Sequence, residues 1–218
     1  MRIERFTFNA FSENTYILVD DAGKCAIIDP GNSNPEEDAA LISFIEENNF
    51  IPTCILQTHC HIDHILGNAS LVERFNIPIV AHSLEQFNVE RASAASLMWG
   101  IDYRPTPEID FSLDALNPIE VGTVRLDVRF TPGHAQGHVV FIHHETKQII
   151  AGDVLFMGSV GRVDLPGCNP SDLVHSIQSQ LYSLPDDYIV HCGHGPSTTI
   201  GREKKSNAFV RENWSALD

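Results

Sequence analysis

The stretch Thr58-His59-Cys60-His61-Ile62-Asp63-His64 brings three histidines and one aspartate together one residue after the apolar run Cys54-Ile55-Leu56. Imidazole and carboxylate groups suit zinc, iron or manganese. His59 and His61 are two residues apart, so extended backbone would turn both side chains to the same side. Asp63 and His64 follow as the chain leaves the strand, so they can enter the same cavity from another direction. Four ligands that arrive from two sides favour two metal ions over one.

A polar loop that happens to be rich in histidine is the alternative, because 11 of the 218 residues are histidine and occasional pairs are expected. Four candidate ligands in such a short segment argue against that alternative, provided that the rest of the chain supplies further ligands. Cys60 lies inside the motif, but extended backbone turns its side chain away from His59 and His61. We therefore expect Cys60 to pack in the core rather than to bind metal.

Composition bounds the class of protein. A length of 218 residues indicates a single domain, residues 1–218, built from two layered halves. The hydrophobic fraction of 43% and the charged fraction of 20% are typical of a globular protein. Fourteen basic and 29 acidic residues give a net charge of −15, which disfavours nucleic acid or an anionic membrane surface as a partner.

The N-terminus and the cysteines indicate the compartment. Met1–Arg5 includes an acidic residue and lacks the long apolar core of a signal peptide, and no run has the length of a membrane-spanning helix. The five cysteines are odd in number and form no Cys-x-x-Cys pair. We expect a reduced, cytoplasmic setting.

Residue patterns along the chain predict alternating strands and helices, which indicates layered α and β structure. Short β-branched and aromatic runs predict strands at 6–8, 15–19, 25–28, 53–57, 77–81, 124–130, 139–143, 148–151 and from 189. Capping residues and helical spacing predict helices at 35–49, 68–75, 84–96, 172–181 and about 202–213. Three prolines predict a long surface loop over 100–118.

Three further junctions place one metal-capable side chain beside glycine, where a strand is expected to end. They are Thr131-Pro132-Gly133-His134, Gly152-Asp153 and Gly193-His194-Gly195. Glycine allows the backbone to approach a ligand cluster closely. Each junction alone is more often an ordinary turn, but together with the first motif they form an ordered set of ligands.

These four motifs resemble those of the metallo-β-lactamase superfamily and, within it, of the glyoxalase II-like hydrolases (hydroxyacylglutathione hydrolases). Asp29-Pro30-Gly31 matches an early turn of the family. The resemblance implies an α/β fold, a four-layer αβ/βα sandwich with the site at the edge between two sheets. It implies two divalent metal ions, zinc being expected and iron or manganese being the alternatives. The implied ligands are His59, His61 and His134 for one ion, Asp63, His64 and His194 for the other, and Asp153 as the bridge.

The resemblance also implies an enzyme, a thioester hydrolase. Two ions roughly 3.5 to 4 Å apart lower the pKa of a shared water, and the resulting metal-bound hydroxide attacks an acyl carbonyl. A thioester such as S-lactoylglutathione is suitable because its thiolate leaves without strong protonation. Asp63 and Asp153 are the candidate catalytic residues, and the expected partner is this small-molecule thioester. The sequence does not determine the oligomeric state.

Residues 158–167 and 198–203 resemble the compact bacterial members of this subgroup. Arg162 falls where longer glyoxalases place a basic residue that contacts glutathione; an ion pair with Asp164 is the alternative. The aromatic residue that follows in glutathione-using members is replaced around Val163-Asp164. His138 and His191 lie near ligands in the sequence and are expected behind them.

Two other activities occur on the same fold. Members that hydrolyse β-lactams lack a bridging carboxylate at the position of Asp153, by the family pattern, so the resemblance disfavours antibiotic hydrolysis. A persulfide dioxygenase with one iron held by His59, His134 and Asp153 stays open because all three ligands are present. The loop at 161–167 favours the hydrolase.

Overall fold

The computed structural model describes residues 1–115 and 117–210, and the chain forms two compact units. The first unit comprises Met1–Leu113 with Glu120–Arg125, and the second comprises Asp114–Ile119 and the chain from Leu126 onward. The prediction of a single domain over residues 1–218 stays a prediction. In the described part of the chain, no helix combines the length and the apolar character that a membrane crossing needs.

The first sheet has six strands in the order of the chain. The first three strands pair antiparallel and the later neighbours pair parallel; the strands are β1 (Arg2–Phe8), β2 (Glu13–Val19), β3 (Lys24–Ile28), β4 (Ile51–Leu56), β5 (Ile79–His82) and β6 (Ile109–Leu113). Because β3 to β6 are parallel, their carboxyl ends meet at one edge of the sheet. The residues that follow β3, β4 and β5 are therefore brought together there.

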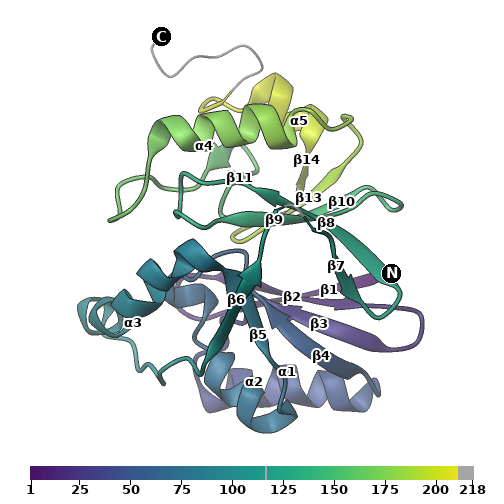
Figure 1. Cartoon of the computed structure of the whole chain (residues 1–218), viewed down its shortest axis with the longest axis vertical. Coiled ribbons are helices and arrows are strands. Elements are labelled where there is room, and N and C mark those ends of the chain that lie inside the picture. Colours follow the sequence, from purple (N-terminus) through teal and green to yellow (C-terminus); the bar gives the residue numbers. More distant parts are fainter. Residues whose placement is uncertain (116, 211–218) are drawn as a thin grey trace. The chain divides into compact units, whose positions relative to one another are not determined.

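Helices α1 (Pro35–Glu47) and α2 (Asn68–Phe75) lie on one face of this sheet (Figure 1). Helix α1 begins where the Asn34 side chain accepts a hydrogen bond from the Glu37 N–H, with proline in the first turn. The fully buried Leu41 and Ile45 join the core beneath the sheet. A third helix, α3 (Gln86–Trp99), follows β5 and the short turn η2 (Ser83–Glu85).

The second sheet has the order β14-β13-β10-β9-β8-β7. Its strands in chain order are β7 (Ile119–Val121), β8 (Val124–Phe130), β9 (Val139–His143), β10 (Gln148–Gly152), β13 (Ile189–Cys192) and β14 (Thr198–Thr199). A separate hairpin joins β11 (Leu155–Phe156) to β12 (Ser159–Val160). Helix α4 (Pro170–Ser176), its π-helical continuation η3 (Ile177–Leu181) and α5 (Ile200–Ser206) follow, and Leu173 belongs to the same hydrophobic core as Val140 and Ile149 in this unit (Figure 1).

The expected strands are present, but the predicted loop over 100–118 is wrong in part, because it contains β6. Ile109 and Leu113 are buried in β6, while Asp110 and Ser112 between them are exposed, so the strand alternates as a half-buried strand should. Prolines on both sides hid this alternation in the sequence.

Four of the five predicted helices differ from their predicted bounds. Helix α1 ends at Glu47 instead of 49, and α3 spans Gln86–Trp99 instead of 84–96. The helix predicted over 172–181 begins at Pro170, and its second half is the π-helical turn η3. The terminal helix ends at Ser206 instead of near 213, because Asn207 adopts an extended conformation. Residues 207–210 are not helical, and 211–213 lie outside the described residues.

Candidate metal centre

The histidine motif follows β4, which ends at Leu56, so His59 and His61 lie in a loop rather than in the expected strand. His61 is extended, with φ −64° and ψ 153°, and begins the 3₁₀ turn η1 (Ile62–His64), which carries Asp63 and His64. The ring centroids of His59 and His61 are 4.8 Å apart, and those of His59 and His64 are 4.2 Å apart. The loop and the turn thus gather the three imidazoles, as the sequence predicted.

Asp29, directly after β3, supports this motif from behind. Its Oδ1 accepts a hydrogen bond from the Thr58 N–H at 2.7 Å, and its Oδ2 accepts from the Thr58 hydroxyl and lies 3.2 Å from His64 Nδ1. Asp29 has φ +50°, a conformation that is uncommon without glycine and that collects at functional sites. The sequence indicates a turn at Asp29-Pro30-Gly31 but not this role.

Two more side chains hold the motif through its backbone. Glu85, which is fully buried, accepts a hydrogen bond from the Cys60 N–H at 2.7 Å. Asn9 donates to the carbonyl of Asp63 at 3.1 Å and to that of Gly31 at 2.9 Å. Cys60 is 1% exposed and belongs to the hydrophobic core, so the prediction that it packs is confirmed. Burial raises the pKa of its thiol well above the ordinary value.

Glu13, also fully buried, adds a carboxyl group near His64, with its Oε1 3.8 Å from His64 Nδ1. Burial raises the pKa of Glu13 well above its ordinary value, although His64 acts in the opposite direction. Sequence reasoning missed this side chain, since a Ser-Glu-Asn turn carries no signal of burial.

Within the second unit, Asp153 lies between two candidate histidine ligands. Strand β10 ends in a register shift between Ile150 and Gly152, and Gly152 has φ +47°, which re-aims the residue that follows. Oδ2 of Asp153 then lies 3.4 Å from Nε2 of His134 and 3.4 Å from Nε2 of His194. One carboxylate oxygen therefore faces two imidazole nitrogens that come from different loops.

His134 and Asp153 have their own supporting contacts. His134 Nδ1 lies 2.8 Å from the carbonyl of Arg162, and the Asp153 N–H donates to Nε2 of His138 at 3.1 Å. His138 thus contacts Asp153, one of the candidate ligands. The ring nitrogens of His191 contact the side chains of Gln148 at 2.8 Å and Ser197 at 3.2 Å, and its expected role behind a ligand stays a prediction.

The hydrogen bonds decide which imidazole nitrogen can bind a metal. A carbonyl only accepts, so His134 Nδ1 carries the proton, and the same holds for His64 Nδ1 against the Asp29 carboxylate. The Thr58 hydroxyl donates to Asp29, so its oxygen accepts from His59 Nδ1 at 3.1 Å. In the neutral imidazole of all three histidines Nε2 therefore keeps its lone pair, which is the arrangement that metal ligands show. Imidazole Nε2 atoms with a lone pair, together with the aspartate carboxylates, are ligands that suit zinc, iron or manganese.

The side chain of Arg162 is held by the carboxylate of Asp164. Its guanidinium makes two hydrogen bonds to the Asp164 carboxylate, at 2.7 and 2.9 Å, and both side chains are exposed. These bonds hold the pKa of Asp164 below its ordinary value. The ion pair expected as the alternative role of Arg162 is confirmed, whereas its carbonyl, which contacts His134, was not anticipated.

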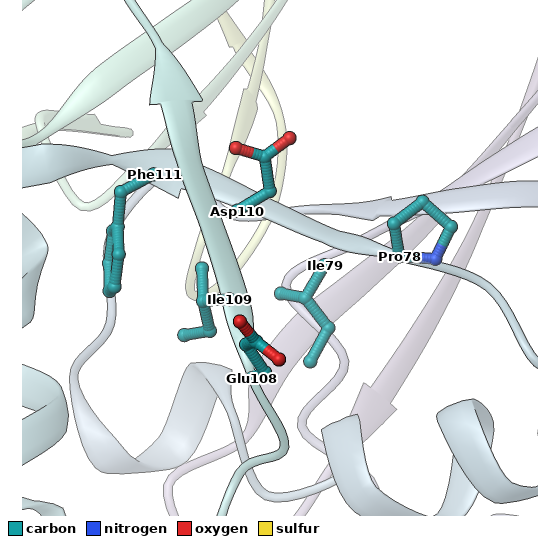
Figure 2. Close-up of a pocket in the computed structure, with 6 residues that line it drawn as sticks. All are labelled: Pro78, Ile79, Glu108, Ile109, Asp110 and Phe111. Carbon is teal, nitrogen blue, oxygen red and sulfur yellow. The ribbon is translucent and has the colours of Figure 1, made fainter.

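A cavity of about 400 Å³ lies elsewhere in the first unit, beside β6 (Figure 2). Its lining, as the structure describes it, contains none of the predicted ligands and consists of Pro78, Ile79, Glu108, Ile109, Asp110 and Phe111. Two carboxylates beside an edge strand discourage pairing with another strand. We assign no chemistry to this cavity.

The class of protein follows from the strand order, the motifs and the histidines whose Nε2 atoms are positioned to bind metal. The family model of the metallo-beta-lactamase superfamily matches residues 9–194, and the chain belongs to that family. The fold predicted from the sequence is thereby confirmed, and the class is that of the metallo-hydrolases, whose fold binds metal ions.

One relative and two solved structures are similar to this chain over nearly its whole length. The hydroxyacylglutathione hydrolase GloC of Haemophilus influenzae is 37% identical over 217 residues, which cover 96% of this chain and 98% of the relative. A solved structure of TTHA1623 in a di-iron-bound form is 37% identical with a TM-score of 0.86, covering 95% of this chain and all of the other. The BLEG-1 B3 metallo-beta-lactamase is 33% identical with a TM-score of 0.87, covering 96% and 99%.

Proposed function

We propose that this protein is a hydrolase with two metal ions that cleaves an acyl thioester, either S-lactoylglutathione or a related compound. The observation that carries the proposal is the position of Asp153, whose Oδ2 is 3.4 Å from Nε2 of both His134 and His194. A single carboxylate oxygen that faces the Nε2 atoms of two histidines is in a position from which it could bridge two ions. An aspartate serving one ion would not need to face both histidines.

In this proposal each ion has three ligands of its own and shares one carboxylate. His59, His61 and His134 would hold one ion, and Asp63, His64 and His194 would hold the other, with Asp153 between them. Within the first unit, Asp63 and His64 belong to η1, and His59 and His61 precede it. The di-iron-bound relative supports two ions per chain, and the metal proposed here is zinc, with iron or manganese as alternatives.

In the proposed reaction, residues of the chain would bind the metal ions and orient the attacking water. Bound ions would acidify a water and polarise the substrate carbonyl. Asp63 and His194 have partly exposed side chains, at 15% and 25%, whereas His59 and His64 are fully buried. Water and substrate would therefore approach past Asp63 and His194, and Asp63 would orient the attacking water. A thiolate leaving group needs no strong acid, so no further proton donor is required.

The thioester class is supported by the GloC relative, which is named for hydroxyacylglutathione hydrolysis. Glutathione as the thiol has less support, since the Arg162 guanidinium is already paired with Asp164. We therefore propose a small-molecule acyl thioester and leave its thiol to the assay.

The test combines metal analysis with a panel of substrates: acyl thioesters, glutathione persulfide under oxygen, and a chromogenic β-lactam. The expected result is about two ions per chain and thioester cleavage. A single iron with oxygen uptake on the persulfide, and no thioester cleavage, would overturn the proposal. Hydrolysis of the β-lactam without thioester cleavage would also overturn it and would align the protein with BLEG-1.

A variant tests the bridge directly. Asp153→Ala is expected to lose thioester cleavage and about one of the two ions, because the shared ligand is removed. Asp172→Ala is the matched control, since Asp172 is an exposed aspartate at the start of α4 in the same unit. Retention of both ions and of activity in Asp153→Ala would show that Asp153 does not bridge.

A further inference from the structure

The buried carboxylate of Glu203, in α5, has no role in the apolar packing of the core or in the proposed reaction. Glu203 is fully buried, and its Oε2 accepts hydrogen bonds from the Gly158 N–H at 2.8 Å and from Asn207 Nδ2 at 2.9 Å. Its Oε1 accepts from the Thr198 hydroxyl. Burying a carboxylate costs free energy that a leucine at this position would not cost. The hydrogen bonds to specific donors are what distinguish Glu203 from such a leucine.

One of those donors, the Gly158 N–H, lies at the tip of the hairpin β11–β12. Gly158, with φ +72°, is in the two-residue turn, and the Asn207 amide also donates to the carbonyl of Ser159 at 3.0 Å. Glu203 and Asn207, both fully buried, thus hold two successive residues of the tip. The hairpin has two residues in each strand and, among the described residues, makes no ladder with the six-stranded sheets, so its own pairing fixes it weakly.

The hairpin connects directly to three proposed ligands. Its first strand begins two residues after Asp153, and the Phe156 ring in that strand stands edge-on to His194 at a centroid distance of 6.0 Å. Its second strand leads into Gly161 and then Arg162, whose carbonyl fixes His134 Nδ1 at 2.8 Å. A shift of the hairpin would therefore move contacts of all three side chains at once.

We propose that Glu203 and Asn207 are positioning residues for the metal centre, acting on His134, Asp153 and His194 through the β11–β12 hairpin. This inference rests on the proposed function, because it requires those three residues to be metal ligands. It assigns α5 a role beyond packing: the hydrogen bonds from α5 select one hairpin position, and that position sets the orientation of the imidazoles. Losing such outer contacts typically weakens metal binding by about 10- to 100-fold.

The variants are Glu203→Gln, Glu203→Ala and Asn207→Asp. Glutamine keeps one oxygen for the Gly158 N–H, alanine keeps none, and aspartate at 207 sets a second carboxylate against Glu203. Metal affinity is measured by competition with a chelator, at a temperature well below each unfolding transition. We expect affinity to fall by about 10- to 100-fold in Glu203→Ala and Asn207→Asp and by less in Glu203→Gln. Cobalt-substituted protein is expected to show a changed visible absorption spectrum, which reports ligand geometry.

Asp20→Asn is the control for lost stability. Asp20 is 6% exposed and accepts backbone hydrogen bonds within the first unit, away from the hairpin. It is expected to lower Tm without changing metal affinity or the cobalt spectrum. Wild-type affinity and spectrum in Glu203→Ala and Asn207→Asp, beside lowered Tm, would overturn the positioning role and leave the proposed function standing. A wild-type protein that binds no metal would overturn both.

Discussion

Gly161→Ala should damage the metal centre by a steric route that the structure defines closely. A Cβ at position 161 would lie 1.9 Å from the carbonyl oxygen of Asp153 and 3.0 Å from Nδ1 of His134. Gly161 is not among the positive-φ residues, so alanine introduces no backbone strain of its own. The whole effect comes from crowding two proposed ligands.

The size of the effect follows from the overlap. Since real Cβ contacts essentially never fall below 3.0 Å, and the contact would be 1.9 Å, the backbone near Asp153 or Gly161 must move by about 1.1 Å (3.0 − 1.9). Overpacking of this kind costs about 1 to 3 kcal/mol, or about 2 to 12 °C in Tm for a chain of this length. The same shift displaces the neighbouring Arg162 carbonyl from His134, so metal affinity should fall by about 10- to 100-fold.

Thermal unfolding of the metal-free protein measures the loss of stability, and chelator competition on the folded protein measures the loss of affinity. Gly100→Ala is the matched control, because Gly100 ends α3 with φ +66° and a Cβ added there would meet no described atom within 4 Å. That control should cost about 1 to 2 kcal/mol through backbone conformation alone, with unchanged metal affinity. Equal metal affinity in Gly161→Ala and wild type would refute the reasoning, whatever happens to Tm.

Three further predictions rest on other contacts. Asp29→Asn should weaken metal binding by about 10- to 100-fold while preserving the fold, because asparagine tolerates the positive φ but loses the charge; wild-type affinity would contradict this. Burial favours a higher pKa for Asp20, but backbone N–H donors hold the pKa below 3.8, so ionised Asp20 stabilises the fold above pH 3.8 and this stabilisation is lost in acid. The Tm of Asp20→Asn should therefore fall less steeply than that of wild type below pH 3.8. An equal fall of Tm with pH in the two proteins would contradict this. Iodoacetamide at pH 8 should modify Cys168 first, since Cys168 is half-buried whereas burial raises the pKa of Cys25 to about 12; early labelling of Cys25 in peptide mass spectra would contradict this.

Much of the fold was predictable because its signals are local. Capping by Asn34 and the apolar spacing in α1 set the helix, and β-branched runs set the strands. Strand β6 was missed because prolines flank its short alternation, and pairing with β5 decides it. The end of α5 was missed because Asn207 binds Ser159 and Glu203 instead of continuing the helix.

The candidate ligands were predictable for another reason. Each lies in the loop or turn that follows a strand, beside glycine or close to another candidate, so residue type and spacing identify it as a candidate without knowledge of the packing. The same local signals could not identify Asp29, Glu85 or Glu203, since a buried carboxylate and an exposed one look alike in a sequence.

The sequence by itself determined which side chains can bind metal and in what order they occur, with Thr58 to His64 supplying the densest group. The tertiary structure decided how those side chains are held. Asp29 reaches His64 across 35 residues, Arg162 reaches His134 across 28, and Glu203 reaches Gly158 across 45. These hydrogen bonds select the imidazole nitrogen that keeps its lone pair and the position of the hairpin beside it. Only chain closure creates them, because a donor and acceptor so far apart in sequence meet when the sheets and their connecting loops have packed.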